Sequence, residues 1–243
     1  MRGIVTAKEA AGMVRGGATV MLGGFMGCGS AHCVVGELVK SGVSGLTLIC
    51  NDASMPGGPD GGEFFASAKL IHSGQVTKMI ATHVGRNPEV TKLVNEGAME
   101  LVLVPQGSFA EMIRAGGAGL GGVLTPAGVG TMVEGFPHVH SVVEVDGRKY
   151  LLERPLRADV ALIGGRFVDR AGNVWYKGTS RNFNQVMATA ADLVIAEADE
   201  IVDIGFIEPE NVMTPGILVD YVVEGGVSAI INSGGGKGGG GIG

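Results

Sequence analysis

Short apolar runs of strand length recur through the first hundred residues, and glycine or polar residues end each of them. Apolar runs of this length, bounded by turn residues, are typical of strands buried on both faces of a sheet. Between the runs, apolar positions recur three and four residues apart, which is the spacing of helices. The expected strands are Ala18–Leu22, Leu46–Cys50, Met79–Thr82 and Leu101–Val104.

Capping residues mark the helix boundaries. Thr6 and Glu9 form a capping box, in which the two side chains satisfy free backbone amides at a helix start. Ser30 is the expected N-cap of the next helix, and Asn87 followed by a proline opens another. The expected helices span Ala7–Arg15, Ala31–Lys40, Pro88–Glu96, Ser108–Arg114 and Phe183–Ala191.

The pattern changes in the second half of the chain. Asp146-Gly147, a dipeptide favoured in two-residue hairpin turns, separates the alternating segments Val142–Val145 and Lys149–Leu152. Further elements expected in this half are a hairpin at Arg170–Asn173 and strands over Val160–Ile163 and Leu193–Ala196. The sequence therefore predicts an α/β fold: an open, mostly parallel sheet flanked by helices, with added antiparallel hairpins.

The segment Val20–Ser30 combines an apolar run with a glycine-rich turn. Gly23-Gly24 ends the run, and Gly27 and Gly29 follow before the next helix. Glycine has no Cβ and tolerates positive φ angles, so a backbone can approach a ligand closely there. Amides at the following helix start have no intrahelical partners and can meet an anion or a developing oxyanion. We expect a binding site in this loop, with main-chain amides exposed between Gly24 and Ser30, and a tight turn without a ligand is the alternative.

Three more specific interpretations of the loop have weaker support. Gly27-Cys28-Gly29 begins a dinucleotide-binding pattern with Asp52 at the end of the next strand, but His32 stands at the third glycine position. Cys28, His32 and Cys33 suggest zinc, yet their spacing is too tight for a structural site, and we expect no metal. A Cys28 nucleophile would need a base, and the sequence assigns none.

Gln106 follows the expected strand Leu101–Val104, at the sheet edge where open α/β folds place binding residues. Its amide could donate a hydrogen bond to a substrate carbonyl, or it could cap the helix that follows. Other histidines and most acidic residues are expected at the surface or in turns, among them His72, His83, His138, His140, Glu9, Glu89, Glu144 and Asp199.

Composition argues against several classes of protein. The 243-residue chain has a net charge of −6 and no Lys/Arg cluster, which argues against nucleic acid or an anionic membrane surface as partner. The apolar runs are too short to span a bilayer, and charged Lys8 and Glu9 stand where a signal peptide needs an apolar core. Three cysteines form no even disulfide framework, so we expect a cytoplasmic protein.

Glycine is abundant throughout, with 44 residues, and most concentrated at the C-terminal end. A segment of this composition cannot bury enough apolar surface to order itself. We therefore expect one domain over residues 1–225 and a disordered glycine-rich tail or linker over 226–243.

The segment Gly16–Ala31 resembles the signature of the A (alpha) subunit of family I coenzyme A-transferases, which centres on Gly-Gly-Phe after three apolar residues. Gly16 departs from the acidic or amide residue of that signature. Ala31 replaces its proline, and alanine is also acceptable in a first helical turn. Further blocks in the family's order are Leu103–Gly107, Ile113–Gly119, Leu124–Pro126, Ser180–Asn184 and Glu200–Asp203. The chain is most similar to the short-chain fatty-acid and acetoacetate type.

This resemblance implies a CoA-transferase/NagB-like fold and a ping-pong reaction. CoA moves from a short-chain acyl-CoA to a free carboxylate such as acetate, butyrate or acetoacetate. A glutamate attacks the thioester and passes through an anhydride to a glutamyl-CoA intermediate. CoA is then a substrate, and we expect no permanently bound cofactor.

The resemblance also implies a partner. In such enzymes the catalytic glutamate lies in the B (beta) subunit, in a block like Ser-Glu-Asn-Gly, and Glu96, Glu134 and Glu224 all lack those neighbours. We therefore expect an alpha subunit that is active only with a beta subunit, as an A2B2 heterotetramer. The resemblance assigns Gln106 as an oxyanion or carbonyl donor, and it assigns CoA binding to Gly24, Phe25, Met26, Gly27, Cys28, Gly29 and Ser30.

Two other functions are compatible with this architecture. One is a non-catalytic sensor that binds a CoA ester or a sugar phosphate, although the chain has no DNA-binding helix pair or basic arm. The other is a nicotinamide dehydrogenase, which rests on the incomplete glycine pattern described above.

Overall fold

A nine-stranded sheet forms the centre of the molecule in the computed structural model, which describes residues 1–56 and 64–225. The expected tail over 226–243 and the internal residues 57–63 lie outside the described residues. Eight strands pair in parallel, and β10 (Val174–Trp175) pairs with β9 in antiparallel fashion. Their order across the sheet is β1 (Gly3–Val5), β12 (Tyr221–Glu224), β11 (Ala191–Val202), β9 (Ala158–Asp169), β2 (Thr19–Leu22), β3 (Leu46–Cys50), β4 (Val76–Ala81) and β5 (Glu100–Leu103).

The chain changes its direction of travel across this sheet between β2 and β9. From β2 it proceeds outward through β3 and β4 to β5, whereas β9 leads through β11 and β12 to the other edge. Leu22, the last residue of β2, pairs with Leu162, while β9 continues to Asp169. Ligands of open α/β sheets bind at such a switch point, outside the carboxyl ends of the strands.

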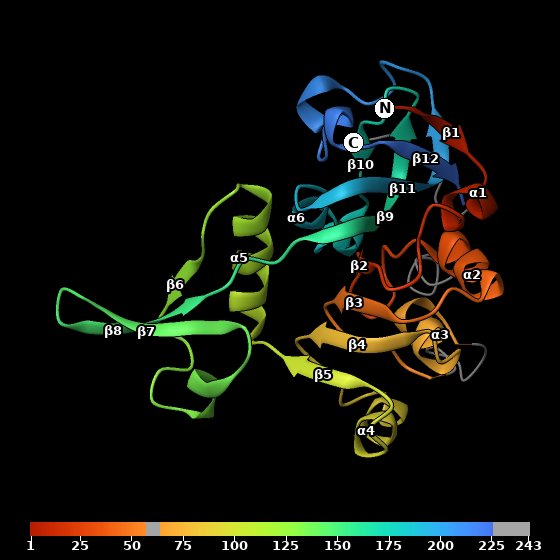
Figure 1. The fold of residues 1–243 in the computed structure, drawn as a ribbon. Coiled ribbons are helices and arrows are strands. Elements are labelled where there is room, and N and C mark those ends of the chain that lie inside the picture. Colours follow the sequence, from red (N-terminus) through yellow and green to blue (C-terminus); the bar gives the residue numbers. More distant parts are fainter. Residues whose placement is uncertain (57–63, 226–243) are drawn as a thin grey trace.

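Helices cover both faces of the sheet (Figure 1). On one face lie α1 (Ala7–Ala11), α2 (His32–Ser41), α3 (Ala66–His72) and α4 (Pro88–Asn95), and on the other lie α5 (Gln106–Gly117) and α6 (Asn184–Ala188). Successive side chains of a strand point to opposite faces. Accordingly, Val20 and Leu22 of β2 belong to the core under α2, and Met21 belongs to the core under α5.

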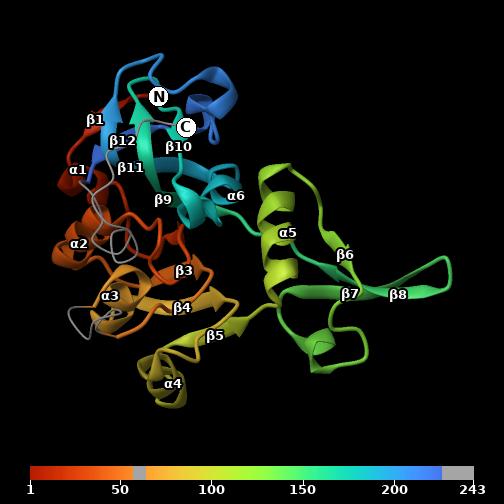
Figure 2. The ribbon, with the colours of Figure 1, turned by 180° about the vertical axis from the view of Figure 1, so that it is seen from behind.

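A small antiparallel sheet projects from this body (Figure 2). It has the order β6 (Val123–Thr125), β8 (Arg148–Glu153) and β7 (Val139–Val145). Asp146 and Gly147 join β7 to β8 with φ angles of 50° and 75°, the left-handed conformations of a type I′ turn. Short 3-10 helices complete the described chain at Met132–Gly135, Gly178–Arg181, Pro209–Asn211 and Gly216–Leu218.

The predicted α/β class, with a mostly parallel sheet and added hairpins, is confirmed, whereas several boundary predictions are wrong. The helix expected over Phe183–Ala191 spans only Asn184–Ala188, and Ala191 begins β11. Helix α1 ends at Ala11 instead of Arg15, because the chain leaves the helix at Gly12. Ser30 is not the N-cap of α2, since its hydroxyl donates to the Gly23 carbonyl at 2.7 Å. Within residues 1–56 and 64–225, no helix is long and apolar enough to cross a membrane.

Candidate functional site

The glycine loop, residues Gly23–Ser30, follows β2 at the switch point. Phe25 and Cys28 close a tight turn in which each amide donates to the other's carbonyl, at 3.1 and 3.0 Å. The side chain of Phe25, at this turn, is 45% exposed. Positive φ angles of 117°, 50°, 80° and 78° occur at Gly24, Met26, Gly27 and Gly29. The sequence therefore forms a compact turn, and three of these four positions are glycines that adopt the conformation without steric cost.

Two glycines of the loop pack against other parts of the protein. A Cβ at Gly23 would lie 1.8 Å from Oδ1 of Asn184, and a Cβ at Gly29 would lie 2.6 Å from the Ser180 carbonyl oxygen. Both distances are well inside van der Waals contact, so a side chain at either position would displace the loop. The close approach that glycine permits at these two positions is to neighbouring protein atoms, and it does not leave room for a ligand there.

Five amides of residues 24–30 already donate within the protein. The acceptors are Oδ1 of Asn182 for Gly24 (3.1 Å), the Cys28 carbonyl for Phe25 (3.1 Å), Oδ2 of Asp52 for Met26 (2.8 Å), the Phe25 carbonyl for Cys28 (3.0 Å) and the Gly27 carbonyl for Ser30 (3.3 Å). The expectation of a row of free amides in this loop is therefore wrong. These internal bonds build a rigid turn whose outward-facing part is the Phe25 side chain.

Polar side chains from outside the loop also hold its carbonyl groups. The donors are Nδ2 of Asn182 to Cys28 (2.9 Å) and Nδ2 of Asn184 to Gly29 (2.9 Å), and Nε2 of His32 lies 2.8 Å from the Gly27 carbonyl oxygen. Burial lowers the pKa of His32, which favours a neutral ring that donates through Nε2. Both faces of the loop peptides are thus fixed by side chains that lie far apart in the sequence.

The structure links Gln106 to the glycine loop through two residues that follow β3. Nε2 of Gln106 donates to Oδ1 of Asn51 at 2.7 Å, and Nδ2 of Asn51 donates to Oδ2 of Asp52 at 2.8 Å. The same Asp52 oxygen accepts the Met26 amide. Gln106 is an exposed residue at the start of α5. No side chain caps the N-terminus of this helix, so the alternative that Gln106 is a helix cap is wrong.

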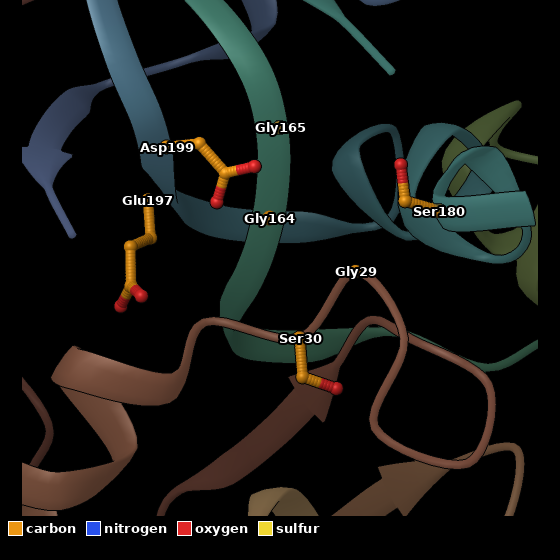
Figure 3. Close-up of a pocket in the computed structure, with 7 residues that line it drawn as sticks. All are labelled: Gly29, Ser30, Gly164, Gly165, Ser180, Glu197 and Asp199. Atoms are coloured by element: carbon orange, nitrogen blue, oxygen red, sulfur yellow. The ribbon is translucent and has the colours of Figure 1, made fainter. Parts of the chain in front are cut away.

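Two acidic residues of β11 border the loop on its other side (Figure 3). Glu197 accepts the amides of Cys33 and Val34 at 3.0 and 2.8 Å, and it thereby caps α2, whose own N-cap residue makes no side-chain bond. Burial raises the pKa of this carboxyl. Asp199 lines the same small pocket with an 11% exposed side chain, so its expected surface position is wrong. Sequence reasoning missed Glu197 entirely.

The three residues considered for zinc have separate partners. Sγ of Cys28 lies 3.4 Å from the Thr179 hydroxyl, His32 contacts the Gly27 carbonyl, and the Cys33 thiol donates to the Gly225 carbonyl at 2.9 Å. Burial, together with Glu197, raises the pKa of Cys33 to about 11, so this thiol is not a nucleophile near neutral pH. Among the described residues, no three His, Cys, Asp or Glu side chains are grouped to hold a metal ion.

A second group of buried polar residues lies where α5 meets the small antiparallel sheet. His138, which we expected at the surface, is 6% exposed, and its Nε2 lies 3.9 Å from Oε1 of Glu153. Glu153 is fully buried, and Ser108 of α5 is 4% exposed. The surface prediction for His138 is therefore wrong. It failed because the residues next to His138 in the sequence do not show that it packs beside the buried Glu153.

The family model for coenzyme A transferase matches residues 4–225 of the chain. This chain belongs to the coenzyme A transferase family. It is 46% identical to the acetate CoA-transferase subunit alpha of Escherichia coli (strain K12), over 90% of this chain and 96% of that protein. It is also 46% identical to the acetoacetyl-CoA:acetate/butyrate CoA transferase alpha subunit of Clostridium acetobutylicum, over 86% of this chain and 91% of that one. The resemblance to CoA-transferase alpha subunits is thus confirmed.

Solved CoA-transferases share the fold. The acyl-CoA transferase YdiF of E. coli O157:H7, solved as a thioester complex with CoA, matches with a TM-score of 0.80 and 21% identity over 91% of this chain. Glutaconate CoA-transferase of Acidaminococcus fermentans matches with a TM-score of 0.74 and 20% identity over 90% of this chain. The chain spans 47% of the YdiF chain and 42% of the mouse mitochondrial succinyl-CoA:3-ketoacid coenzyme A transferase 2A, to which it is 40% identical. It therefore covers about half of these longer CoA-transferases.

Proposed function

We propose that this chain is the α subunit of a CoA-transferase that moves CoA from a short-chain acyl-CoA to acetate, butyrate or acetoacetate. The observation that carries the proposal is the hydrogen-bonded connection between Gln106 and the glycine loop at the switch point. It joins a side-chain donor to a rigid turn with an exposed aromatic residue, Phe25. The acyl range follows the names of the bacterial relatives.

The nucleophile in this proposal is a glutamate of a β subunit. Its carboxylate attacks the thioester carbonyl, the C–S bond breaks, and an acyl-glutamyl anhydride and CoA thiolate result. The thiolate then attacks the glutamyl carbonyl, which releases the first acid and leaves a glutamyl-CoA thioester. The acceptor carboxylate repeats these steps in reverse. Thioester energy is retained, so the reaction needs no ATP.

Gln106 is the proposed donor to the oxygen that becomes negative in each attack. Its carboxamide nitrogen carries two hydrogens, and Asn51 accepts one of them. The other hydrogen is left for a substrate oxygen at the exposed start of α5. A donor held in place before the reaction stabilises an oxyanion without reorganisation during the attack, which is why such groups contribute strongly to catalysis.

The glycine loop is the proposed contact for the pantetheine arm of CoA. Phe25 supplies an exposed apolar surface for it, while Gly24 through Ser30 keep that surface in one conformation through their internal hydrogen bonds. A loop that is rigid before binding lowers the entropy cost of association. CoA is a substrate here, the A2B2 arrangement is part of the proposal, and the cytoplasmic location stays a prediction.

Assays with acetyl-CoA and butyrate test the proposal directly. We expect the purified chain to show no turnover above background alone, and to gain it on co-expression with a CoA-transferase β subunit. The assembled enzyme should give parallel double-reciprocal lines, as a ping-pong reaction requires. Robust turnover by the single chain, or intersecting lines from the assembled enzyme, would contradict the proposal.

A further inference from the structure

A continuous chain of hydrogen bonds runs from the start of α5 to the glycine loop, across the carboxyl ends of three strands. Gln106 follows β5, Asn51 and Asp52 follow β3, and Met26 follows β2. The three successive bonds measure 2.7, 2.8 and 2.8 Å. Asn51 and Asp52 are 1% and 6% exposed, so water competes little for these bonds.

The carboxylate of Asp52 determines the direction of every bond in this chain. An ionised carboxylate only accepts hydrogen bonds. Asp52 accepts the Ser54 amide on Oδ1, at 2.8 Å, and both the Met26 amide and Nδ2 of Asn51 on Oδ2. Three donors therefore converge on one acid, and the Asn51 amide must turn its NH2 group toward it.

The orientation of Asn51 then sets that of Gln106. With its NH2 group on Asp52, Asn51 presents its carbonyl oxygen to Gln106, and the Thr82 hydroxyl donates to the same oxygen at 3.1 Å. Only the NH2 group of Gln106 can donate to Oδ1 of Asn51. The Gln106 side chain is therefore oriented with its NH2 group, and not its carbonyl oxygen, toward Asn51. A flipped Gln106 amide would place a partial negative charge where a donor is needed.

We propose that Asn51 is a positioning residue, oriented by Asp52, which fixes the Gln106 carboxamide with its N–H group available to the substrate. This inference rests on the proposed function of Gln106 as an oxyanion donor. Asn51 acts through Gln106, and its loss leaves the Gln106 amide free to rotate and to flip. Transition-state stabilisation falls, while binding of the CoA portion by the glycine loop is unaffected.

Kinetics of the assembled α/β enzyme with acetyl-CoA and butyrate provide the test. We expect Gln106→Ala to lower kcat by roughly 10²–10³-fold, and Asn51→Ala to lower it on the order of 10²-fold, with KM for acetyl-CoA little changed. The decisive measurement is the double variant. If Asn51 acts through Gln106, adding Asn51→Ala to Gln106→Ala causes no further loss of kcat. Asn95→Ala, an exposed asparagine of α4, is the matched control and should leave kcat unchanged.

Asn51→Asp supplies a second test, which applies even if the Asn51→Ala protein does not fold. A protonated carboxyl at position 51 donates to Asp52 and still accepts from Gln106. An ionised one repels the carboxylate of Asp52 and is pushed out of the position in which it accepts from Gln106. Asp52 and the buried Cys50 thiol adjoin this position in the chain. We therefore expect kcat of Asn51→Asp, relative to the parent enzyme, to be highest at low pH and to decline as pH rises.

The outcomes separate the two proposals. An unchanged kcat in Gln106→Ala contradicts the donor role of Gln106 itself. A normal loss in Gln106→Ala with an equal and additive loss from Asn51→Ala overturns the positioning role alone. A relative kcat of Asn51→Asp that does not vary with pH also overturns it.

Discussion

At the scale of single residues, the buried pair Glu153 and His138 shows how burial without good hydrogen-bond partners changes ionisation. Neither carboxylate oxygen and neither ring nitrogen makes a hydrogen bond of good geometry within the described chain. Burial raises the pKa of Glu153, and the Ser108 hydroxyl lowers it by less. Burial also lowers the pKa of His138. Each group is therefore held toward its neutral form, because a buried charge without good partners is unfavourable.

The raised pKa of Glu153 predicts a pH-dependent stability. The protonated carboxyl makes its full contribution to the free energy of unfolding below its ordinary pKa near 4.5. That contribution is lost as pH rises through the raised pKa of the folded state. Glu153→Gln removes the ionisation, so we expect it to raise the melting temperature at pH 8 by about 2–4 °C per kcal/mol recovered. The difference between variant and parent should vanish near pH 4.

The exposed Glu144 of neighbouring strand β7 provides the control, since Glu144→Gln should change the melting temperature little at either pH. The lowered pKa of His138 leaves its ring neutral at pH 8 in both parent and variant, so its ionisation does not contribute to the difference measured there. A Glu153→Gln protein that melts below its parent at pH 8 would contradict the account of this pair.

At the scale of elements, the glycine loop is built by side chains that come from other parts of the chain. Asp52 follows β3, Asn182 and Asn184 precede and begin α6, and Glu197 lies in β11. Each of them fixes a backbone group of the loop or of α2. The loop and the start of α2 are therefore held in place by hydrogen bonds from other elements.

Two alanine substitutions separate this packing from the intrinsic cost of a positive φ angle. Gly29 and Gly97 have φ angles of 78° and 70°, but only a Cβ at Gly29 meets other atoms, at 2.6 Å from the Ser180 carbonyl. We expect Gly97→Ala to cost about 1 kcal/mol of unfolding free energy and to retain full activity in the assembled enzyme.

Gly29→Ala should cost roughly 1–3 kcal/mol more, because the clash shifts the loop against Ser180. It should also raise KM for acetyl-CoA. Denaturant unfolding and steady-state kinetics of both variants measure these effects. Equal losses in the two variants would show that the loop does not depend on its contact with Ser180.

Local signals predicted much of the fold, while contacts between distant residues account for what was missed. The capping box at Thr6, the N-cap Asn87 and the Asp146-Gly147 hairpin are confirmed because a few neighbouring residues determine each of them. The cap of α2 could not be predicted, since Glu197 lies 164 residues from Cys33 in the sequence. The position of the glycine loop was predicted, but two of its amides donate to Asp52 and Asn182, which lie 26 and 158 residues away in the sequence.

At the scale of the whole molecule, the site lies open at one edge of the sheet. Phe25 and Gln106 are both exposed; Phe25 follows β2 at the switch point, and Gln106 follows the edge strand β5. This chain spans about half the length of the longer CoA-transferases that share its fold. The openness is what we expect of the proposed α subunit, in which the nucleophile comes from a β subunit.

Locating the covalent intermediate tests that account most directly. The assembled enzyme is incubated with acetyl-CoA alone, trapped by reduction with borohydride, and digested for mass spectrometry of both subunits. A glutamyl thioester is the intermediate expected, so its reduction product should appear on one glutamate of the β subunit and on no residue of this chain. A modified glutamate within this chain would contradict the central claim.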